Sequence, residues 1–334
     1  MDDLFDIKKM EKTIKKAKRR ASWKMIVMTI AVLVILIIIG SIANRSINYR
    51  LETPIQISAS GFHEISAPNE FIGKLERYQG ILGGENRYTT YKIIEGKVVY
   101  TGEERYGFGL FRDENLNRIG TESPILIGES FSEEDIQKQR YNELGQREMV
   151  FFYPFHQYNN YRRDLSLLDD IGQEKVMEVA LSFDKGYSFK EIESMIPKDV
   201  TLSWLWVDDV NEENVEDFQG KVHDEHNKIV DTYNFVRSEH TVYGVSLFDA
   251  NGDRQVDPIN YFILNIESGK RYKARWQGEY NRLFTTLSGE DGKLTEDDLQ
   301  YFGVVVTGNA QTLSQLTDLP FIKASSIGVI TDKY

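Results

Sequence analysis

The hydrophobic pattern of the chain is dominated by one uninterrupted apolar run, MIVMTIAVLVILIIIGSIA, at residues 25–43. An α-helix rises about 1.5 Å per residue, so roughly 20 apolar residues cross a hydrocarbon core about 30 Å thick. The run therefore predicts a transmembrane helix. Lys and Arg are concentrated before it, in KKAKRR at 15–20, and positive charge prefers the cytoplasmic side. This asymmetry places residues 1–24 in the cytoplasm and residues 44–334 on the extracytoplasmic side of the cell membrane.

A cleaved signal peptide is the alternative, because Ser41, Ile42 and Ala43 form the small-x-small pattern of a cleavage site. The segment before the run is long for a signal peptide, and it carries acidic residues such as Asp2 and Glu11. The run itself is also at the long end for a signal-peptide core. We therefore expect an uncleaved signal anchor with a single span.

The segment before the span has its own pattern, with apolar positions at steps of three and four that predict an amphipathic helix. These positions are Leu4, Ile7, Met10, Ile14, Ala17 and Ala21. In one interpretation, residues 1–24 bind a cytoplasmic protein in a groove through Leu4, Ile7, Met10 and Ile14. In the other, the Lys- and Arg-rich faces hold the helix on the inner leaflet. Both interpretations remain open.

Beyond the span, Pro54 and several Ser and Gly residues predict an irregular spacer over residues 44–70. A first extracytoplasmic region is expected over residues 71–160. Its segment 86–111 is rich in Tyr and Val with Gly punctuation, which predicts two strands joined by a hairpin turn at Glu95-Gly96. Because no motif marks the end of this region, its boundary rests on the polar composition that follows it.

The second region, residues 165–334, alternates short strands with short helices. Strands are predicted at 147–155, just before it, and then at 174–183, 201–209, 241–249, 304–308 and 321–331. In the second region, helices are predicted at 188–197, 257–269, 275–287 and 309–319, and the polar segment up to about residue 239 is also expected to be helical. A further helix, at 132–145, is predicted in the first region. The fold class is therefore one N-terminal transmembrane helix followed by a mixed α/β (or α+β) extracytoplasmic region.

Particular side chains support these elements. Ser188 and Glu191 have the spacing of a capping box, and Asp257 precedes a proline at a helix start. Trp204 and Trp206 lie at i and i+2 of a strand, so they share one face. Large aromatic residues at strand spacing are more often core than groove, and we expect both tryptophans to be buried.

Composition limits the classes of function. The chain has 334 residues, of which 41% are hydrophobic and 12% aromatic, enough for a packed core of one or two domains. Its net charge is −12, and residues 1–43 hold nine Lys or Arg and four Asp or Glu, so residues 44–334 carry −17. An acidic outer part is a poor candidate for binding nucleic acid or anionic lipid. The absence of cysteine excludes disulfides, thiol nucleophiles and Cys-type zinc sites.

Candidate chemistry is sparse. No GxSxG, HExxH or phosphate-binding Gly-rich motif occurs, and His223 and His226 are too few for a metal site. Residues 249–257, DANGDRQVD, partly match a calcium loop, but Arg254 stands where the loop needs Gly and Asn260 where it needs Glu. A plain turn explains the same residues. We therefore predict no enzymatic activity, no catalytic residues, no metal, no cofactor and no small-molecule substrate.

One segment resembles a known family. VMEVALSFDKGYSFKEIESMIPKDVTLSWLWVDD at 176–209 resembles the C-terminal domain of bacterial sigma factor regulators, and 321–334 is similar to its closing strand. The basic head and span resemble the short N-terminal module that accompanies this domain. The resemblance covers residues 165–334 well and 10–50 loosely, and it leaves 51–150 without a counterpart.

The resemblance implies a membrane-bound anti-sigma factor that restrains an extracytoplasmic-function sigma factor through an outer sensor domain. Many such proteins carry a globular cytoplasmic domain, whereas only 24 residues precede the span here. The implied partner of residues 1–24 is a sigma factor or a partner membrane regulator. Signalling through the packing of the span and proteolysis near residues 44–60 both remain open. Two alternatives to a regulator remain. One is an envelope structural or assembly subunit, and the other is an extracytoplasmic hydrolase.

Overall fold

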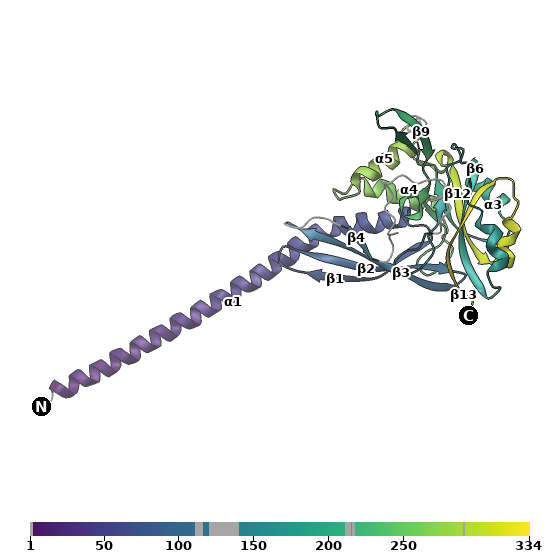
Figure 1. The fold of residues 1–334 in the computed structure, drawn as a ribbon. Helices are drawn as coiled ribbons and strands as arrows, with labels where there is room; N and C mark the ends of the chain where they lie inside the picture. Colours follow the sequence, from purple (N-terminus) through teal and green to yellow (C-terminus); the bar gives the residue numbers. More distant parts are fainter. Residues whose placement is uncertain (1–2, 111–115, 120–139, 211–214, 216–217, 290) are drawn as a thin grey trace.

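The first element of the protein is a helix of 64 residues, α1 (Asp3–Ser66), about 95 Å long at 1.5 Å per residue. The computed structural model describes residues 3–110, 116–119, 140–210, 215, 218–289 and 291–334. The N-terminal part of α1 projects alone from the rest of the molecule (Figure 1). Its apolar window is long enough to cross a membrane, and none of that window is buried against other described residues. The expected long apolar helix is confirmed.

The irregular spacer predicted over residues 44–70 is wrong, because α1 continues through Pro54 to Ser66. An interior proline costs a helix about 3 kcal/mol, but burial of an apolar face offsets this cost. Ile55, Ala59 and Ile65 are buried at helical spacing. The helix ends just before Pro68, as expected for a residue that cannot continue it.

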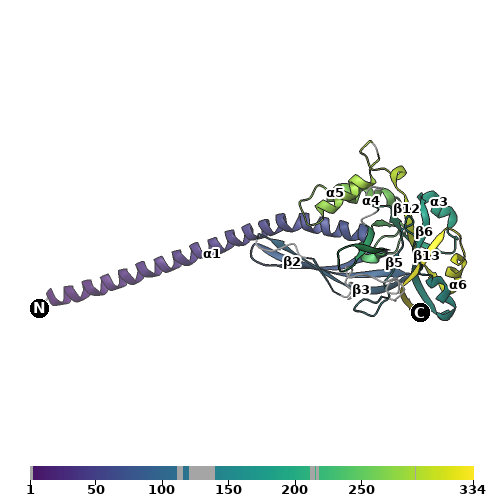
Figure 2. The same ribbon diagram turned by 45° about the horizontal axis from the view of Figure 1, so that its top comes forward.

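A four-stranded antiparallel sheet lies alongside the C-terminal part of α1 (Figures 1 and 2). Its strands, in order, are β1 (Glu70–Gln79), β2 (Gly83–Ile94), β3 (Lys97–Gly109) and β4 (Leu116–Ile119). The predicted hairpin turn is confirmed, with φ of 49° at Glu95 and 78° at Gly96, the positive values that a tight type I′ connection requires. Tyr88, Tyr106 and Phe108 pack this sheet against Ile55 and Ala59 of the helix.

A second sheet has five strands, all paired antiparallel, in the order β11-β7-β12-β6-β13. Their bounds are β6 (Lys175–Tyr187), β7 (Thr201–Val207), β11 (Gly244–Ser246), β12 (Tyr301–Asn309) and β13 (Ile322–Asp332). The helices are α3 (Phe189–Met195), α4 (Pro258–Gly269), α5 (Gln277–Leu287) and α6 (Ala310–Leu313), and the 3-10 turns are η1 (Asp164–Asp170), η3 (Glu239–Thr241), η4 (Glu296–Asp298) and η5 (Ser314–Leu316). Antiparallel pairing throughout makes the region α+β.

Both faces of this sheet are buried. Leu205 and Val207 of β7 join the main core with α4 and α5, whereas Trp204 and Trp206 join a separate aromatic cluster with Phe151. Both tryptophans are fully buried. The prediction that they share a core face is confirmed.

The helix expected up to residue 239 is wrong. The described part of this segment forms a hairpin, β8 (Gln219–His223) and β9 (Ile229–Asn234). The Asp224 carboxylate accepts hydrogen bonds from the backbone N–H groups of His226 and Lys228, at 2.8 and 2.9 Å. Such an Asx turn competes with helix formation. His223 therefore ends β8, and His226 lies in the turn.

The segment before the second sheet also differs from expectation. The strand predicted at 147–155 is reduced to β5 (Val150–Phe151), which pairs with β10 (Arg237–Ser238). Most of the helix predicted at 132–145 lies outside the described residues, and its end is a turn closed by a bridge between Tyr141 and Arg147. The strand is short because the backbone N–H groups of Phe152 and Tyr153 donate to the hydroxyls of Ser182 and Tyr158 instead of to a neighbouring strand.

Candidate functional site

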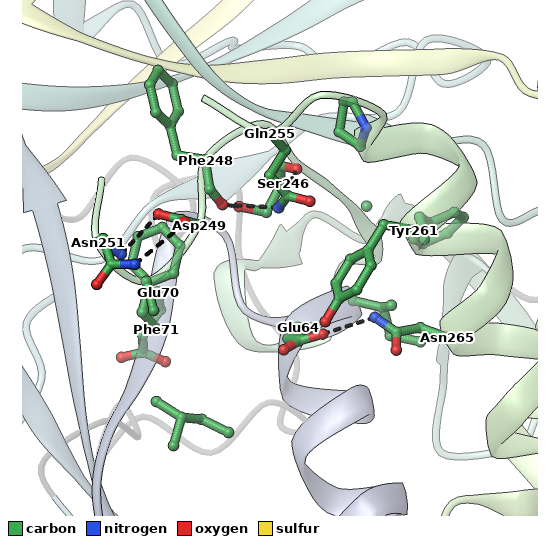
Figure 3. A pocket seen from close by; sticks show the side chains of 16 residues that line it. Glu64, Glu70, Phe71, Ser246, Phe248, Asp249, Asn251, Gln255, Tyr261 and Asn265 are labelled. Atoms are coloured by element: carbon green, nitrogen blue, oxygen red, sulfur yellow. Dashed lines mark hydrogen bonds between the residues drawn. The ribbon is translucent and has the colours of Figure 1, made fainter. Parts of the chain in front are cut away.

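The C-terminal end of α1 meets both sheets and α4 at one place, which we call the junction. It contains a partly open cavity of about 410 Å³, lined by α1, β1, β11, α4 and the loop between β11 and α4. Tyr261 and Asn265 of α4 point toward Glu64 of α1 (Figure 3), and Asn265 Nδ2 donates to Glu64 Oε2 at 2.8 Å. The cavity thus lies where the long helix is attached to the C-terminal region.

The cavity is electronegative. Its lining holds the carboxylates of Glu64, Glu70 and Asp249 but no Lys, Arg or His. The backbone N–H groups of Asp253 and Asn251 lower the pKa of Asp249, so this carboxylate stays ionised at neutral pH. Partial burial, then the neighbouring Glu64, raises the pKa of Tyr261 to about 12, so the phenol stays protonated. The lining therefore favours a cation or a hydrogen-bond donor over an anion.

The acidic loop beside the cavity is a turn. Asp249 Oδ1 accepts from the backbone N–H of Asn251 at 2.8 Å and of Asp253 at 3.0 Å. The side chain that would ligate calcium at the first position therefore organises the loop itself. Among the residues that the structure describes, no group of three or more His, Asp or Glu is arranged to hold a metal.

Aromatic residues of the C-terminal region pack against α1 next to the cavity. Phe62 stacks on Trp276 with ring centroids 5.2 Å apart and planes at 23°. The Tyr280 hydroxyl donates to the Ser58 carbonyl at 3.0 Å. Gly61 lies beside the same hydroxyl, and a Cβ at this position would come within 3.0 Å of it. The helix is thus held by close shape complementarity as well as by hydrogen bonds.

A buried charge cluster connects the two sheets. Lys92 of β2 is 3% exposed, and its Nζ lies 2.7 Å from Glu178 Oε1 of β6 and 3.1 Å from Glu239 Oε2 of η3. Burial acts to lower the pKa of Lys92, but the carboxylates of Glu178, Glu239 and Glu70 together raise it above its ordinary value. The ammonium therefore stays charged and ties the first sheet to the second.

The carboxylates of this cluster have further partners. Glu178 Oε1 accepts from the Val329 backbone N–H at 3.1 Å, and Glu178 Oε2 accepts from Asn69 Nδ2 at 3.2 Å. Burial raises the pKa of Glu239, and Lys92 opposes this shift. Full hydrogen bonding is what makes buried charge tolerable. The cluster therefore connects β2 to β6, β13 and η3, and to Asn69 just before β1.

His63 links the end of α1 to the first sheet. Its ring nitrogens lie 3.8 Å from Glu70 Oε2 and 3.5 Å from Glu104 Oε1, and the side chain is buried. Both carboxylates are held in turn, since Thr101 donates to Glu70 and Tyr88 donates to Glu104. The junction therefore joins α1 to the sheet through ionisable groups as well as apolar packing.

The site residues named from the sequence lie at the other end of α1. Ile7, Met10 and Ile14 are 60%, 70% and 54% exposed, and the side chain of Leu4 lies outside the described residues. Some 44 residues of helix separate Ile14 from Ser58, about 65 Å. The predicted partner face and the junction are therefore far apart, but they lie on one continuous helix.

Sequence reasoning missed the junction. One signal was available: Ile55, Ala59, Phe62 and Ile65 recur at steps of four and three within the supposed spacer, the spacing of a helix face. The charge cluster carried no such signal, because Lys92 lies 86 residues from Glu178 and 147 from Glu239.

Residues 168–329 match the family model described as sigma factor regulator C-terminal. This region belongs to the sigma factor regulator family. The resemblance over residues 165–334 is thereby confirmed, and the family is a regulatory one. No curated protein and no solved structure gives a significant match to the chain.

The sigma factor regulator domain supplies one side of the junction. It contains α4, the aromatic residues Trp276 and Tyr280, and Glu178 of the charge cluster. The other side, α1 and the four-stranded sheet, lies outside the matched residues. The junction is therefore the place where the family domain meets the membrane helix.

Proposed function

We propose that this protein is a membrane-anchored anti-sigma factor, or an accessory protein of one, that controls an extracytoplasmic-function sigma factor through an outer sensor region. Residues 1–24 lie in the cytoplasm and residues 44–334 on the extracytoplasmic side. The protein binds its partner and catalyses no reaction. The family match over residues 168–329 supports the link to sigma factor regulation.

The observation that carries this proposal is the continuity of α1, which joins the inner segment to the junction without a break. A helix is stiff along its axis, so a shift or rotation at the junction is carried to residues 1–24. The exposed side chains of Ile7, Met10 and Ile14 form the face that enters a groove of the sigma factor or of a partner membrane regulator.

This continuity favours transmission by the span over proteolysis near residues 44–60. All of these residues are helical, and part of the stretch packs on the first sheet, with Ile55 and Ala59 buried. A protease needs locally unfolded chain, so cleavage here requires the junction to open first. A signal that alters the junction reaches the inner segment without that step.

A promoter-reporter assay in a strain lacking the gene tests the proposal. Deletion should derepress one regulon, and the full-length gene should restore repression. A variant carrying Ile7→Asp, Met10→Asp and Ile14→Asp should fail to restore it, because charge on this face prevents groove binding. The matched control, Lys12→Asp with Lys16→Asp on another face, should restore it. If deletion changes no sigma-dependent promoter, the regulatory proposal is wrong and a structural role in the envelope takes its place.

A further inference from the structure

The turn between β1 and β2 lies against α1 immediately after the apolar run. Asn44 Nδ2 and Asn48 Nδ2 both donate to the Gly80 carbonyl at 3.0 Å. Asn44 Oδ1 accepts from the Leu82 backbone N–H at 2.7 Å. Since Asn44 is the first residue after the run at 25–43, the turn is held at the level where the span ends.

The backbone of the turn is closely constrained. Leu82 has φ of 53°, a left-handed value that is unfavourable for a bulky side chain. A Cβ on Gly83 would lie 2.7 Å from the Phe108 carbonyl oxygen. Only glycine at this position therefore allows β2 to approach β3 this closely. The bond from Leu82 to Asn44 thus holds an unfavourable backbone, and the turn keeps its height along α1.

Apolar side chains gather at this end of the sheet. We define the membrane-proximal tip as Tyr78, Ile81, Leu82 and Leu110. Ile81 is 91% exposed, and Tyr78 and Leu110 are also exposed. Leu110 belongs to the same tip because its backbone N–H donates to the Leu82 carbonyl at 3.0 Å. A single exposed apolar residue is ordinary, but three at one end, beside the end of a span, form a surface that needs a partner.

The height of the tip identifies that partner. The 19 residues of the run span about 28 Å, close to a hydrocarbon core of about 30 Å. The headgroup layer adds roughly 6 Å on each side, and the rise from Asn44 to Asn48 is about 6 Å. The carbonyl held by these two residues therefore lies in the headgroup layer. Arg45 and Arg50 are exposed on the same stretch of α1 and fit anionic lipid headgroups.

We propose that the membrane-proximal tip binds the bilayer that α1 crosses, with Ile81 and Leu110 at the boundary of headgroups and acyl chains and Tyr78 among the headgroups. Tyrosine and apolar side chains are the residues that occupy this depth. The occupant is the lipid surface itself, and the span provides the local concentration that makes so small a contact effective. The outer region then has two attachments to the membrane, the span and the tip, which together limit its tilt.

The natural chain has no cysteine, so single-cysteine variants carry one environment-sensitive fluorophore. Ile81→Cys is labelled with nitrobenzoxadiazole in the full chain, reconstituted in phosphatidylethanolamine and phosphatidylglycerol vesicles. The matched control is Val98→Cys. Val98 is 68% exposed on β3 of the same sheet, and ten residues of strand, about 33 Å, separate its level from the tip.

A lipid-borne spin-label quencher should reduce the emission of the fluorophore at position 81 (label 81) at least threefold more than that of the fluorophore at position 98 (label 98). The emission of label 81 should also be blue-shifted relative to that of label 98. Equal quenching at the two positions overturns the proposal. Self-quenching of label 81 that rises with protein density and ignores the lipid quencher identifies a second copy as the occupant, and also overturns it. If Ile81→Cys lowers the melting temperature, Leu110→Cys is measured in its place with the same criteria. The inference needs only the span, so it stands or falls independently of sigma factor regulation.

Discussion

At the scale of single residues, the buried cation of the junction has the largest expected effect. Replacing Lys92 by Met leaves Glu178 and Glu239 buried without their cation, and breaking such a pair costs about 3–5 kcal/mol. The full chain in mild detergent should lose about this much free energy of unfolding, measured with urea. Lys74→Met is the control, since Lys74 and Glu76 form an exposed pair on the same sheet. Equal midpoints for the two variants would contradict a structural role for the cluster.

A second residue-scale prediction concerns pH. Asp208 follows the end of β7 and is partly buried. Burial raises the pKa of its carboxyl to about 7. The Val210 backbone N–H acts to lower this pKa, and the neighbouring Asp209 acts to raise it. A carboxyl with a raised pKa contributes its stability below the ordinary value near 4 and loses it as the pH rises through about 7.

Relative to Asp208→Asn, the natural chain should therefore lose on the order of 2 kcal/mol of unfolding free energy between pH 4.5 and pH 8. Thermal unfolding at both pH values measures the difference. Asp297→Asn, which removes an exposed carboxylate, is the control variant. A difference between Asp208→Asn and the natural chain that stays constant over this range would show that Asp208 does not titrate there.

Residues that act through near neighbours were the ones predictable from sequence. Ser188 and Glu191 form the expected capping box, with the Ser188 N–H donating to Glu191 Oε2 at 2.8 Å. Asp257 caps α4 as expected. Lys92 was not predictable, because its partners come from distant strands, and only the fold shows that a strand lysine is buried.

At the scale of elements, the contact between α4 and α5 is closely packed. A Cβ on Gly269, at the end of α4, would lie 2.3 Å from the ring of the fully buried Tyr280. Gly269→Ala should therefore destabilise the protein by about 2–3 kcal/mol, the cost of overpacking a core.

Gly278, within α5, is the matched control. A Cβ there meets nothing within 4 Å, and alanine is the better helix former. Gly278→Ala should raise the melting temperature slightly, while Gly269→Ala lowers it by several degrees. The same sign for both substitutions would show that the space around Gly269 relaxes more readily than the structure indicates.

Two elements show why local pattern failed. The residues of the supposed spacer contain Pro54 and several serines, yet they are helical because their apolar face is buried. The hydroxyls of Ser60 and Ser66 donate to backbone carbonyls four residues earlier, so they are satisfied within the helix. The segment carrying β8 and β9 is polar enough for a helix surface, but the turn at Asp224 and the β-branched pair Ile229-Val230 favour a hairpin. In both cases the spacing of apolar residues and the local turn chemistry indicate the structure, whereas the polar composition of the segment does not.

At the scale of the whole molecule, the orientation of the chain in the membrane can be tested by cysteine labelling. The natural protein has no cysteine, so a single introduced cysteine is the only thiol that reacts. Val256 is fully exposed in the loop before α4, and Met10 is exposed near the start of α1. A membrane-impermeant maleimide applied to intact cells should label Val256→Cys and leave Met10→Cys unlabelled until the cells are opened. The reverse pattern would place the sigma factor regulator domain in the cytoplasm.

The unbroken course of α1 also fixes an angular relation between the two ends of the protein. Each helical residue turns the chain by about 100°, so the azimuth of Ile7 and Met10 is set by the count of residues between them and Phe62. One residue gained or lost within the span would swing the inner face through more than a quarter circle, whereas seven would nearly return it to its original bearing. For this protein, the number of residues in the membrane helix determines direction as well as length.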